Sequence, residues 1–273
     1  MRRILQLSTL CIAAGVASAC KPADVETVAA VPTSGVRFIN AVPDTAGAAG
    51  LDFRFVDLVE NSNDFRVTFR NNPQSSGGVT ASSAIQYKAA QAGSRHFRIF
   101  LDDTIQTIAS TVLKDTTVNF TAGHNYTVLL QGNARGGGLR LNVIDEAVPD
   151  PAAQVALRVM NTTGAPVDAR QYVSTGSAPA SATWSSVPAY GVSTYVTVAP
   201  SQIKFNIQPA GGGTALFADA LALIGQPIGT QTGGCTVGVD CDVIPGTTVP
   251  GSAITLIVFP PSVAGSRASS FTT

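Results

Sequence analysis

VRFINAVPD (residues 36–44) recurs approximately as LRVMNTT (residues 157–163). Each copy is an apolar run that carries one arginine and one asparagine. After each copy comes an extended segment that contains Asp, and later a turn followed by a second apolar segment. These later segments are residues 51–55 and 121–130 after the first copy and residues 167–171 and 249–258 after the second. A period of about 120 residues is too long for a solenoid and predicts two tandem domains.

Between these landmarks, short strand signals alternate with Gly, Pro, Asn and Asp clusters, which is typical of an all-β protein. The expected strands are residues 51–56, residues 65–70, a row of Phe97, Ile99 and Leu101, and a hairpin of residues 125–131 and 139–144 around the turn at 133–138. Residues 216–224 have some helical character, but their neighbours favour a strand. No stretch predicts an amphipathic helix.

We therefore expect two tandem antiparallel β-sandwich domains of immunoglobulin-like topology, at residues 36–147 and 152–273. The boundary falls in residues 145–151, where two prolines interrupt any strand. The second copy lacks the Pro-Asp pair of the first, and no strand matching residues 139–144 follows it. We expect it to be divergent or incomplete.

The N-terminus resembles a bacterial lipoprotein signal. Arg2 and Arg3 precede an apolar run, and Ala17-Ser18-Ala19 leads directly to Cys20. The resemblance implies removal of residues 1–19 and acylation of Cys20, which anchors the chain in a membrane; an ordinary secretory signal cut near Ala19 is the alternative. By the same resemblance, Lys21 after the cysteine implies the outer membrane, with the chain facing the periplasm or the cell surface. Residues 20–35 read as a flexible tether.

Composition excludes some partners. Apolar residues reach 45%, charged residues only 12%, and the formal net charge is zero, so nothing indicates nucleic-acid binding. Residues 36–150 hold ten Lys or Arg and eleven Asp or Glu, whereas residues 151–273 hold four of each. The charge-poor second half is consistent with packing on a partner, although Thr, Ser, Gly and Gln also solvate a surface.

Cys235 and Cys241 are the cysteines left in the folded part, and they favour a small disulfide loop in an oxidising compartment. A metal site is the alternative, but two thiols without a nearby histidine make a poor zinc shell.

The opening VRFINAVPD, the following LDF run and the segment AGHNYTVLLQG (residues 122–132) are similar to the bacterial domain-of-unknown-function family numbered 4397 (DUF4397). The second half keeps LRVMN but departs from the family pattern after it. The resemblance implies secreted or lipidated β-sandwich modules, and it implies no activity.

Residues able to carry catalysis are scarce. His96 and His124 are the only histidines, neither accompanies a G-x-S-x-G elbow, and we expect structural or surface roles for both. Asp145, Glu146 and Asp150 could surround a calcium ion, but their spacing matches no calcium loop, so a solvated linker is the favoured interpretation. We expect no catalytic residues, metal or cofactor.

Two further groups are candidate ligand contacts. Five arginines fall at polar-facing strand positions and would form a basic stripe for an anionic glycan or lipid headgroup if their strands were neighbours. They are Arg54, Arg66, Arg70, Arg95 and Arg98. An ordinary mixed-charge sheet face is the favoured alternative. Trp184, with Tyr190 and Tyr195, would suit a sugar-stacking platform, but a core tryptophan is the stronger expectation.

The sequence thus predicts a non-catalytic, lipid-anchored envelope protein with a binding or scaffolding role at the outer membrane. A carbohydrate-binding or adhesion module on the cell surface is the alternative. The expected partners are the membrane, through the lipid, and an envelope protein or glycan.

Overall fold

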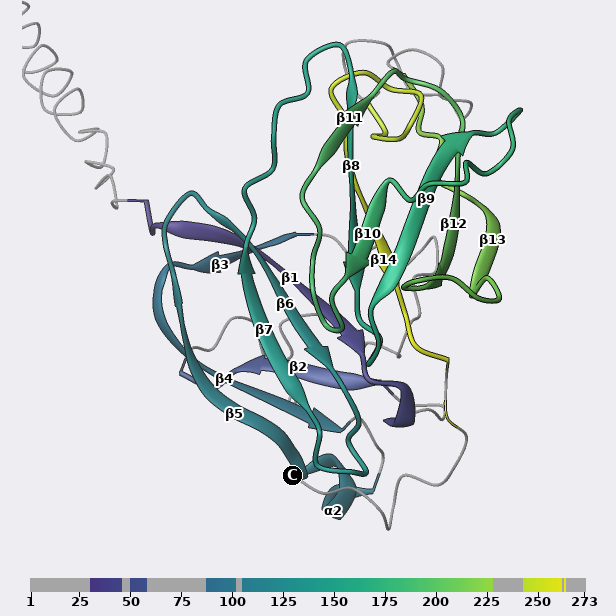
Figure 1. Ribbon diagram of the computed structural model, residues 1–273. Coiled ribbons are helices and arrows are strands. Elements are labelled where there is room, and N and C mark those ends of the chain that lie inside the picture. The colour runs from purple at the N-terminus through teal and green to yellow at the C-terminus, as the bar shows by residue number, and fades with distance from the viewer. Residues whose placement is uncertain are drawn as a thin grey trace, which may run out of the picture. The chain divides into compact units, whose positions relative to one another are not determined.

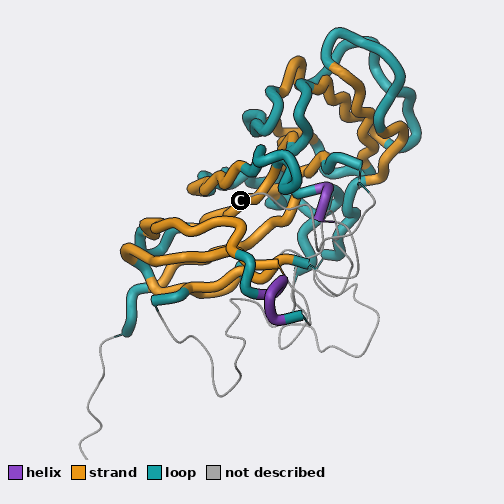
Figure 2. Tube along the Cα trace, turned by 90° about the horizontal axis from the view of Figure 1, so that it is seen from below, coloured by secondary structure: helices purple, strands orange, loops and turns teal. Residues whose placement is uncertain are grey.

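The computed structural model describes residues 30–45, 50–57, 87–101, 105–227, 243–261 and 263. The chain divides by its contacts into Met1–Val31 and Pro32–Thr273. The described part of the second unit is built from strands, as Figures 1 and 2 show, and the prediction of an all-β protein is confirmed. Its helical elements are the single turns η1 (Pro43–Thr45) and α2 (Gln106–Ala109), and no described helix has the length and apolar character needed to span a membrane.

Among the described residues, the first half of the unit contains two sheets. One has the order β3-β1-β6-β7, formed by β3 (Lys88–Gln91), β1 (Thr33–Ala41), β6 (Asn125–Gln131) and β7 (Arg140–Asp145). The other has the order β2-β4-β5, formed by β2 (Leu51–Phe55), β4 (Gly93–Leu101) and β5 (Val112–Phe120).

The described residues of the second half also form two sheets. One has the order β11-β8-β14, formed by β11 (Val196–Val198), β8 (Val155–Asn161) and β14 (Ala253–Val258). The other has the order β10-β9-β12-β13, formed by β10 (Trp184–Val187), β9 (Val167–Val173), β12 (Ile203–Pro209) and β13 (Phe217–Leu221).

The two repeated segments occupy equivalent places in the two halves. The first becomes β1 and pairs in parallel with β6, and the second becomes β8 and pairs in parallel with β14. Purely antiparallel sheets were expected, and these two parallel pairs correct that prediction. Parallel neighbours require a long crossover, and residues 42–124, which contain the second sheet of the first half, provide it between β1 and β6.

Equivalent asparagines end the two repeated strands in the same way. The side-chain oxygen of Asn40 accepts a hydrogen bond from the backbone N–H of Val42 at 3.0 Å, and that of Asn161 accepts one from Thr163 at 3.0 Å. Such Asx turns satisfy a backbone donor locally where a strand stops. The repeat detected in the sequence is therefore also a repeat of local structure.

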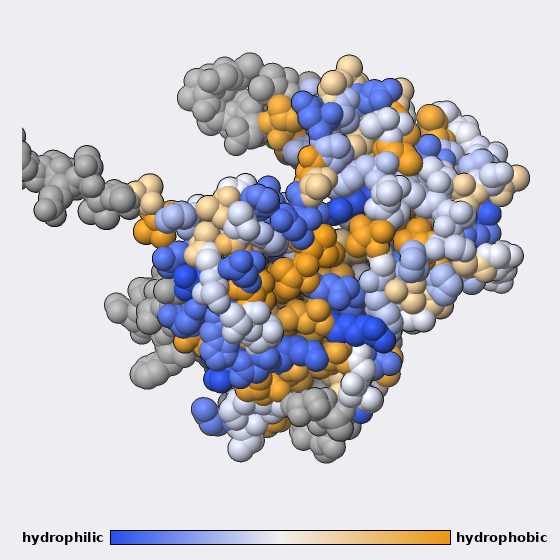
Figure 3. All heavy atoms as spheres, turned by 60° about the vertical axis from the view of Figure 1, so that its left-hand side comes forward, coloured by the Kyte–Doolittle hydropathy of each residue, from blue (hydrophilic) through white to orange (hydrophobic). Residues whose placement is uncertain are grey.

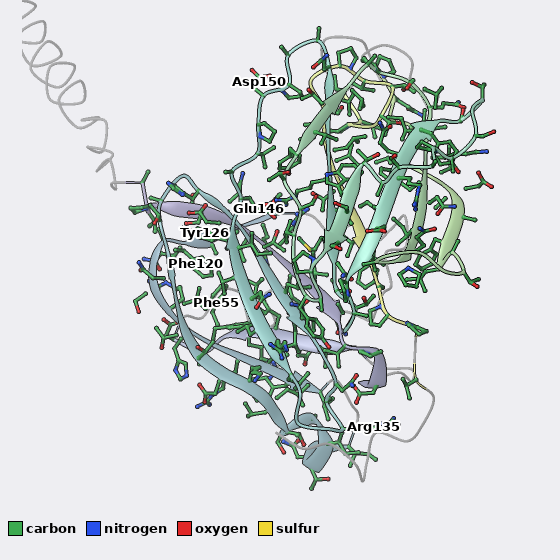
Figure 4. The ribbon with its side chains drawn as sticks, viewed as in Figure 1. Phe55, Phe120, Tyr126, Arg135, Glu146 and Asp150 are labelled. Atoms are coloured by element: carbon green, nitrogen blue, oxygen red, sulfur yellow. The ribbon has the colours of Figure 1, made fainter. Side chains whose placement is uncertain are left out.

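Each half has its own hydrophobic core between its two sheets. The first is rich in aromatic side chains: Phe53 lies 4.7 Å from Phe38 and 4.0 Å from Phe97 between ring centroids. Phe55, Phe120 and Tyr126 continue this core, as their labelled positions in Figure 4 show. The expected inward rows of β2 and β4 are confirmed, because alternate side chains of both strands are buried there.

A smaller cluster joins the two halves. Ile39 of β1 and Leu129 of β6 pack with Met160 of β8 and the partly buried Ile257 of β14. The register makes these contacts equivalent, since Ile39 is paired with Leu129 and Met160 with Ile257. The outer faces of the two parallel pairs thus meet through corresponding side chains.

The predicted hairpin is confirmed, and the structure shows what holds it. β6 and β7 pair antiparallel across residues 132–139. The buried carboxylate of Asp44 accepts hydrogen bonds from the backbone N–H groups of Ala134 at 2.8 Å and Arg135 at 2.7 Å. Asp44 belongs to the Pro-Asp pair that the second copy lacks. In the described residues of the second half, no strand follows β14 in the way that β7 follows β6.

Other expectations have mixed outcomes. Residues 216–224 contain a strand, β13, as their neighbours indicated. The folded region begins at Thr33 rather than Val36, because the start of β1 pairs with β3 and the hydroxyl of Ser34 donates to the carbonyl of Thr121. The predicted strand at residues 65–70 lies outside the described residues.

Replacing Asp44 with alanine removes both acceptors from the β6–β7 turn, so we expect the free energy of unfolding to fall by about 2–3 kcal/mol. Urea-induced unfolding measures the loss, and hydrogen exchange at the amides of Ala134 and Arg135 locates it. Asp44→Asn, which keeps one acceptor oxygen, should lose less. An unchanged midpoint for Asp44→Ala would show that this carboxylate does not hold the turn.

Candidate functional site

The repeated arginines lie at corresponding positions of the two parallel pairs. Arg37 is paired in register with Thr127, and Arg158 with Thr255. In each pair the guanidinium Nε donates to the threonine hydroxyl, at 2.7 Å in the first half and 2.9 Å in the second. Each side chain therefore lies across its neighbouring strand, on the face that is turned away from the core of its own half.

An aromatic ring covers each guanidinium. The ring of Tyr87 lies 4.9 Å from the Arg37 guanidinium carbon, and the ring of Tyr195 lies 4.7 Å from that of Arg158. Cation–π contacts of this kind stabilise a partly desolvated cation. The exposed fractions of the two arginine side chains are only 15% and 7%.

One carboxylate, that of Glu146, accepts hydrogen bonds from both arginines. Glu146 follows β7, its side chain is fully buried, and Figure 4 shows it where the connection to β8 begins. Its Oε1 accepts from Arg37 Nη2 at 3.0 Å and also from the Thr127 hydroxyl, while its Oε2 accepts from Arg158 Nη2. The backbone N–H of Glu146 donates to the carbonyl of Asn125 at 2.8 Å. We call Arg37, Thr127, Glu146 and Arg158 the glutamate cluster.

The electrostatics of the glutamate cluster favour ionised Glu146. Burial raises the pKa of its carboxyl group, but the hydrogen bond from Thr127 and the charges of Arg158 and Arg37 outweigh burial and lower the pKa below 4.5. Two cations surround one anion, so loss of the glutamate charge would leave two guanidinium groups facing each other in a dry site.

The expectation of a solvated linker was therefore wrong for Glu146. Its neighbours do behave as surface residues: Asp145 pairs with His124 at 2.9 Å, and Asp150 accepts from the backbone N–H of Ala152 at 2.9 Å. No calcium site forms from the three, because each carboxylate has a different partner. A signal for the cluster was present in the sequence, since an arginine recurs inside both apolar repeats and a threonine recurs inside both closing runs.

The described arginines of the predicted stripe are already bonded to aspartates. Arg54 pairs with Asp52 at 2.5 Å, Arg95 with Asp57 at 3.1 Å and Arg98 with Asp115 at 2.7 Å. Arg54 and Arg98 are register partners, so part of the row exists on β2 and β4. Arg66 and Arg70 lie outside the described residues.

His96 completes this surface by bonding Asp115 at 2.5 Å through Nε2. The hydrogen bonds from His96 and Arg98 lower the pKa of Asp115. On the face drawn in Figure 3, hydrophilic residues lie beside hydrophobic ones. The described arginines thus form a mixed-charge face, which was the favoured interpretation.

Trp184 lies in the core of the second half, as the stronger expectation stated. Only 5% of the residue is exposed, its ring lies 6.3 Å from that of Phe205, and its indole N–H donates to the carbonyl of Thr194. Tyr195 covers Arg158, and Tyr190 lies 5.0 Å from the guanidinium of Arg140. The three aromatic residues do not form a shared exposed platform.

An apolar groove of about 880 Å³ lies in the second half, and sequence reasoning did not find it. Its lining is formed by residues 163–167, Pro209, Leu216, Phe217 and residues 258–261. None of these residues is charged. They come from the β8–β9 loop, from both strands of the β12–β13 hairpin and from the end of β14, so only the tertiary structure brings them together.

The remaining predicted sites are three cysteines, which the structure does not describe. Cys20, Cys235 and Cys241 lie outside the described residues. Within the part of the chain that the structure describes, no group of three or more His, Cys, Asp or Glu residues is arranged to hold a metal ion.

Replacing Glu146 with glutamine removes the charge shared by the two arginines. Because breaking a buried ion pair leaves an uncompensated charge, we expect a loss of about 3–5 kcal/mol in the free energy of unfolding, measured by urea denaturation. Asp145→Asn is the matched control, since that adjacent, half-exposed carboxylate should contribute less than about 1 kcal/mol. Equal losses in the two variants would contradict a special role for Glu146.

The glutamate cluster also predicts the direction of acid sensitivity. The pKa of Glu146 is lower in the folded chain than its ordinary value of 4.5, so its stabilising contribution is complete above that pH and declines as the pH falls through the lowered value. The difference in unfolding free energy between the natural chain and Glu146→Gln should therefore shrink on acidification. A difference that grows toward low pH would refute this assignment.

Comparison with known proteins yields one family. The family described as a domain of unknown function (DUF4397) matches residues 34–170, a span that begins in β1, contains all four residues of the glutamate cluster and ends within β9. No curated protein matches the chain. Because the match covers half of its residues, the chain belongs to the DUF4397 family.

Proposed function

We propose that this chain is a lipid-anchored protein of the bacterial cell envelope that binds or scaffolds other macromolecules without catalysing a reaction. The lipoprotein-like signal ending at Cys20 supports the anchor. We further propose that the two halves are tandem immunoglobulin-like sandwich modules, the second an incomplete copy of the first. Two separate cores and the equivalent parallel pairs β1–β6 and β8–β14 support that division.

The observation that carries the binding role is the uncharged apolar groove of the second half. Apolar grooves that remain open on a protein surface are typical of binding sites. Leu216 and Phe217 line the groove and are each nearly half exposed. The low charge of residues 151–273 leaves little electrostatic barrier to a partner that buries this surface.

The glutamate cluster supports a scaffolding role. A single connection between two modules normally permits relative motion. Here one buried carboxylate bonds arginines from both modules, and the cluster around Ile39 and Met160 adds apolar contact. A fixed arrangement would hold the groove in one position relative to the first module.

The carbohydrate-binding alternative receives less support from the described residues. Its predicted aromatic platform would need an exposed Trp184, which is buried. Its predicted basic stripe would need free arginines, and Arg54 and Arg98 are bonded to aspartates.

The anchor is tested by replacing Cys20 with serine and fractionating cells. We expect the natural chain in the membrane fraction and Cys20→Ser in the soluble or secreted fraction, because the acyl chains would be lost. Cys11→Ser is the matched control, since Cys11 lies inside the predicted signal and would be removed with it. A natural chain that is already soluble would overturn the proposed anchoring.

A further inference from the structure

The two halves differ at one sheet edge. In the first half, β7 pairs antiparallel with β6 over six residues. The equivalent of β6 in the second half is β14, and among the described residues no strand pairs with its outer edge. The segment of β14 is AITLIV, without the charges or prolines that proteins use to protect an open edge.

The pairing with β8 identifies which backbone groups face this edge. The carbonyls of Ser252 and Val258 accept from Ala156 and Thr162, on the β8 side. Because the N–H and C=O of one strand residue point to the same side and alternate along the strand, Ile254 and Leu256 also point toward β8. The N–H and C=O groups of Ala253, Thr255 and Ile257 therefore point outward. The residue of β6 that corresponds to Ala253 is Asn125, and its carbonyl accepts a hydrogen bond from the backbone N–H of Glu146, on the β7 side.

Burial differs between β6 and its equivalent in the second half, β14. In β6, every residue after Asn125 is buried, whereas in β14 only Val258 is buried and the other five residues are partly exposed. Ile254 and Leu256 pack against the second core but remain partly open to solvent. A strand in the position of β7 would complete the cover over this row.

The apolar groove lies at the end of the same edge. In the first half, the corresponding end is closed by the β6–β7 turn, whose Ala134 is fully buried and whose Leu139 packs on the core. In the second half, Val258 and the following residues line the groove instead. The turn is held by Asp44, and the second copy has no matching Pro-Asp pair. The edge and the groove are thus two parts of one position that no strand of the described residues fills.

We propose that the outer edge of β14 and the adjoining groove form a strand-acceptor site for an extended segment of another protein. The segment runs antiparallel to β14, as β7 does to β6, and its main chain bonds Ala253, Thr255 and Ile257. It presents uncharged apolar side chains at alternate positions, because no charged residue lines the groove. This inference names the partner class of the proposed binding role and rests on that role.

A second copy of this chain fits the site less well. Two β14 edges paired antiparallel would satisfy the backbone groups. However, β14 is preceded by a tight turn at Gly251, whose φ of 82° directs the chain away before it could fill the groove. A segment of another protein that extends beyond the paired strand would occupy both the edge of β14 and the groove.

Hydrogen exchange of the non-acylated chain of residues 21–273, followed amide by amide, tests the open edge. We expect slow exchange at Ile254, Leu256 and Val258, which point toward β8, and fast exchange at Ala253, Thr255 and Ile257. Protection of all six amides in the monomer would show that this chain covers its own edge and would overturn the proposal. Loss of that protection on deleting residues 264–273 would identify these residues as the cover. Protection confined to a dimer seen by light scattering would overturn the proposal in favour of a second copy.

Binding is tested with a synthetic peptide of residues 138–144 carrying R140T, which has the apolar pattern of β7 without its charge. Adding this peptide should slow hydrogen exchange at the amides of Ala253, Thr255 and Ile257. A scrambled peptide of the same composition should not slow it. Phe217→Ser in the groove should weaken binding roughly tenfold, as expected for loss of about 1.4 kcal/mol. Leu223→Ser, at an exposed apolar residue that does not line the groove, should leave it unchanged.

Equal binding by the two peptides, or equal loss in the two variants, would overturn the proposal. These results are independent of anchoring, because they are obtained in solution with the non-acylated chain of residues 21–273. A failure here would leave the fractionation result for Cys20→Ser unaffected.

Discussion

The joining of the two halves depends on one buried carboxylate held between two arginines. Each arginine is placed by its own half, through a parallel strand pair and a threonine hydroxyl, and neither half alone contains the complete cluster. Burying charges is costly unless every charge is paired, so the cluster is satisfied only when both halves are folded and in contact. This constraint makes one unit of two β-rich halves that each have a separate core.

The two copies of the repeat, which supply the arginines of the cluster, differ at one sheet edge within the described residues. Both halves keep the parallel pair, the arginine, the asparagine turn and the threonine. Only the first keeps Asp44, which binds the turn that returns the chain as β7. In the second half the chain continues from Val258 into Phe259-Pro260-Pro261, and proline cannot donate to a β ladder. The second copy lacks the Pro-Asp pair, and among the described residues no strand follows β14 as β7 follows β6.

Much of the fold was predictable because local patterns are strong in this chain. Alternation in β2 and β4, the glycine-rich turn between β6 and β7, and the repeat itself each report a short-range preference that tertiary packing reinforces. The parallel pairing of β1 with β6 was not predictable in this way. It joins residues about 90 positions apart, and alternation along one strand carries no information about the direction of its neighbour.

The sequence by itself determined the class of the protein: an all-β chain built on a repeat, with a lipoprotein-like start and a charge-poor second half. Only the tertiary structure decided the role of individual residues. Glu146 reads as part of a polar linker until Arg37 and Arg158 meet it from both sides. Leu216, Phe217 and Phe259 read as ordinary strand and loop residues until the fold brings the β8–β9 loop, the β12–β13 hairpin and the end of β14 together around a groove. Burial and charge pairing depend on neighbours that are distant in the chain, and those neighbours are set by packing.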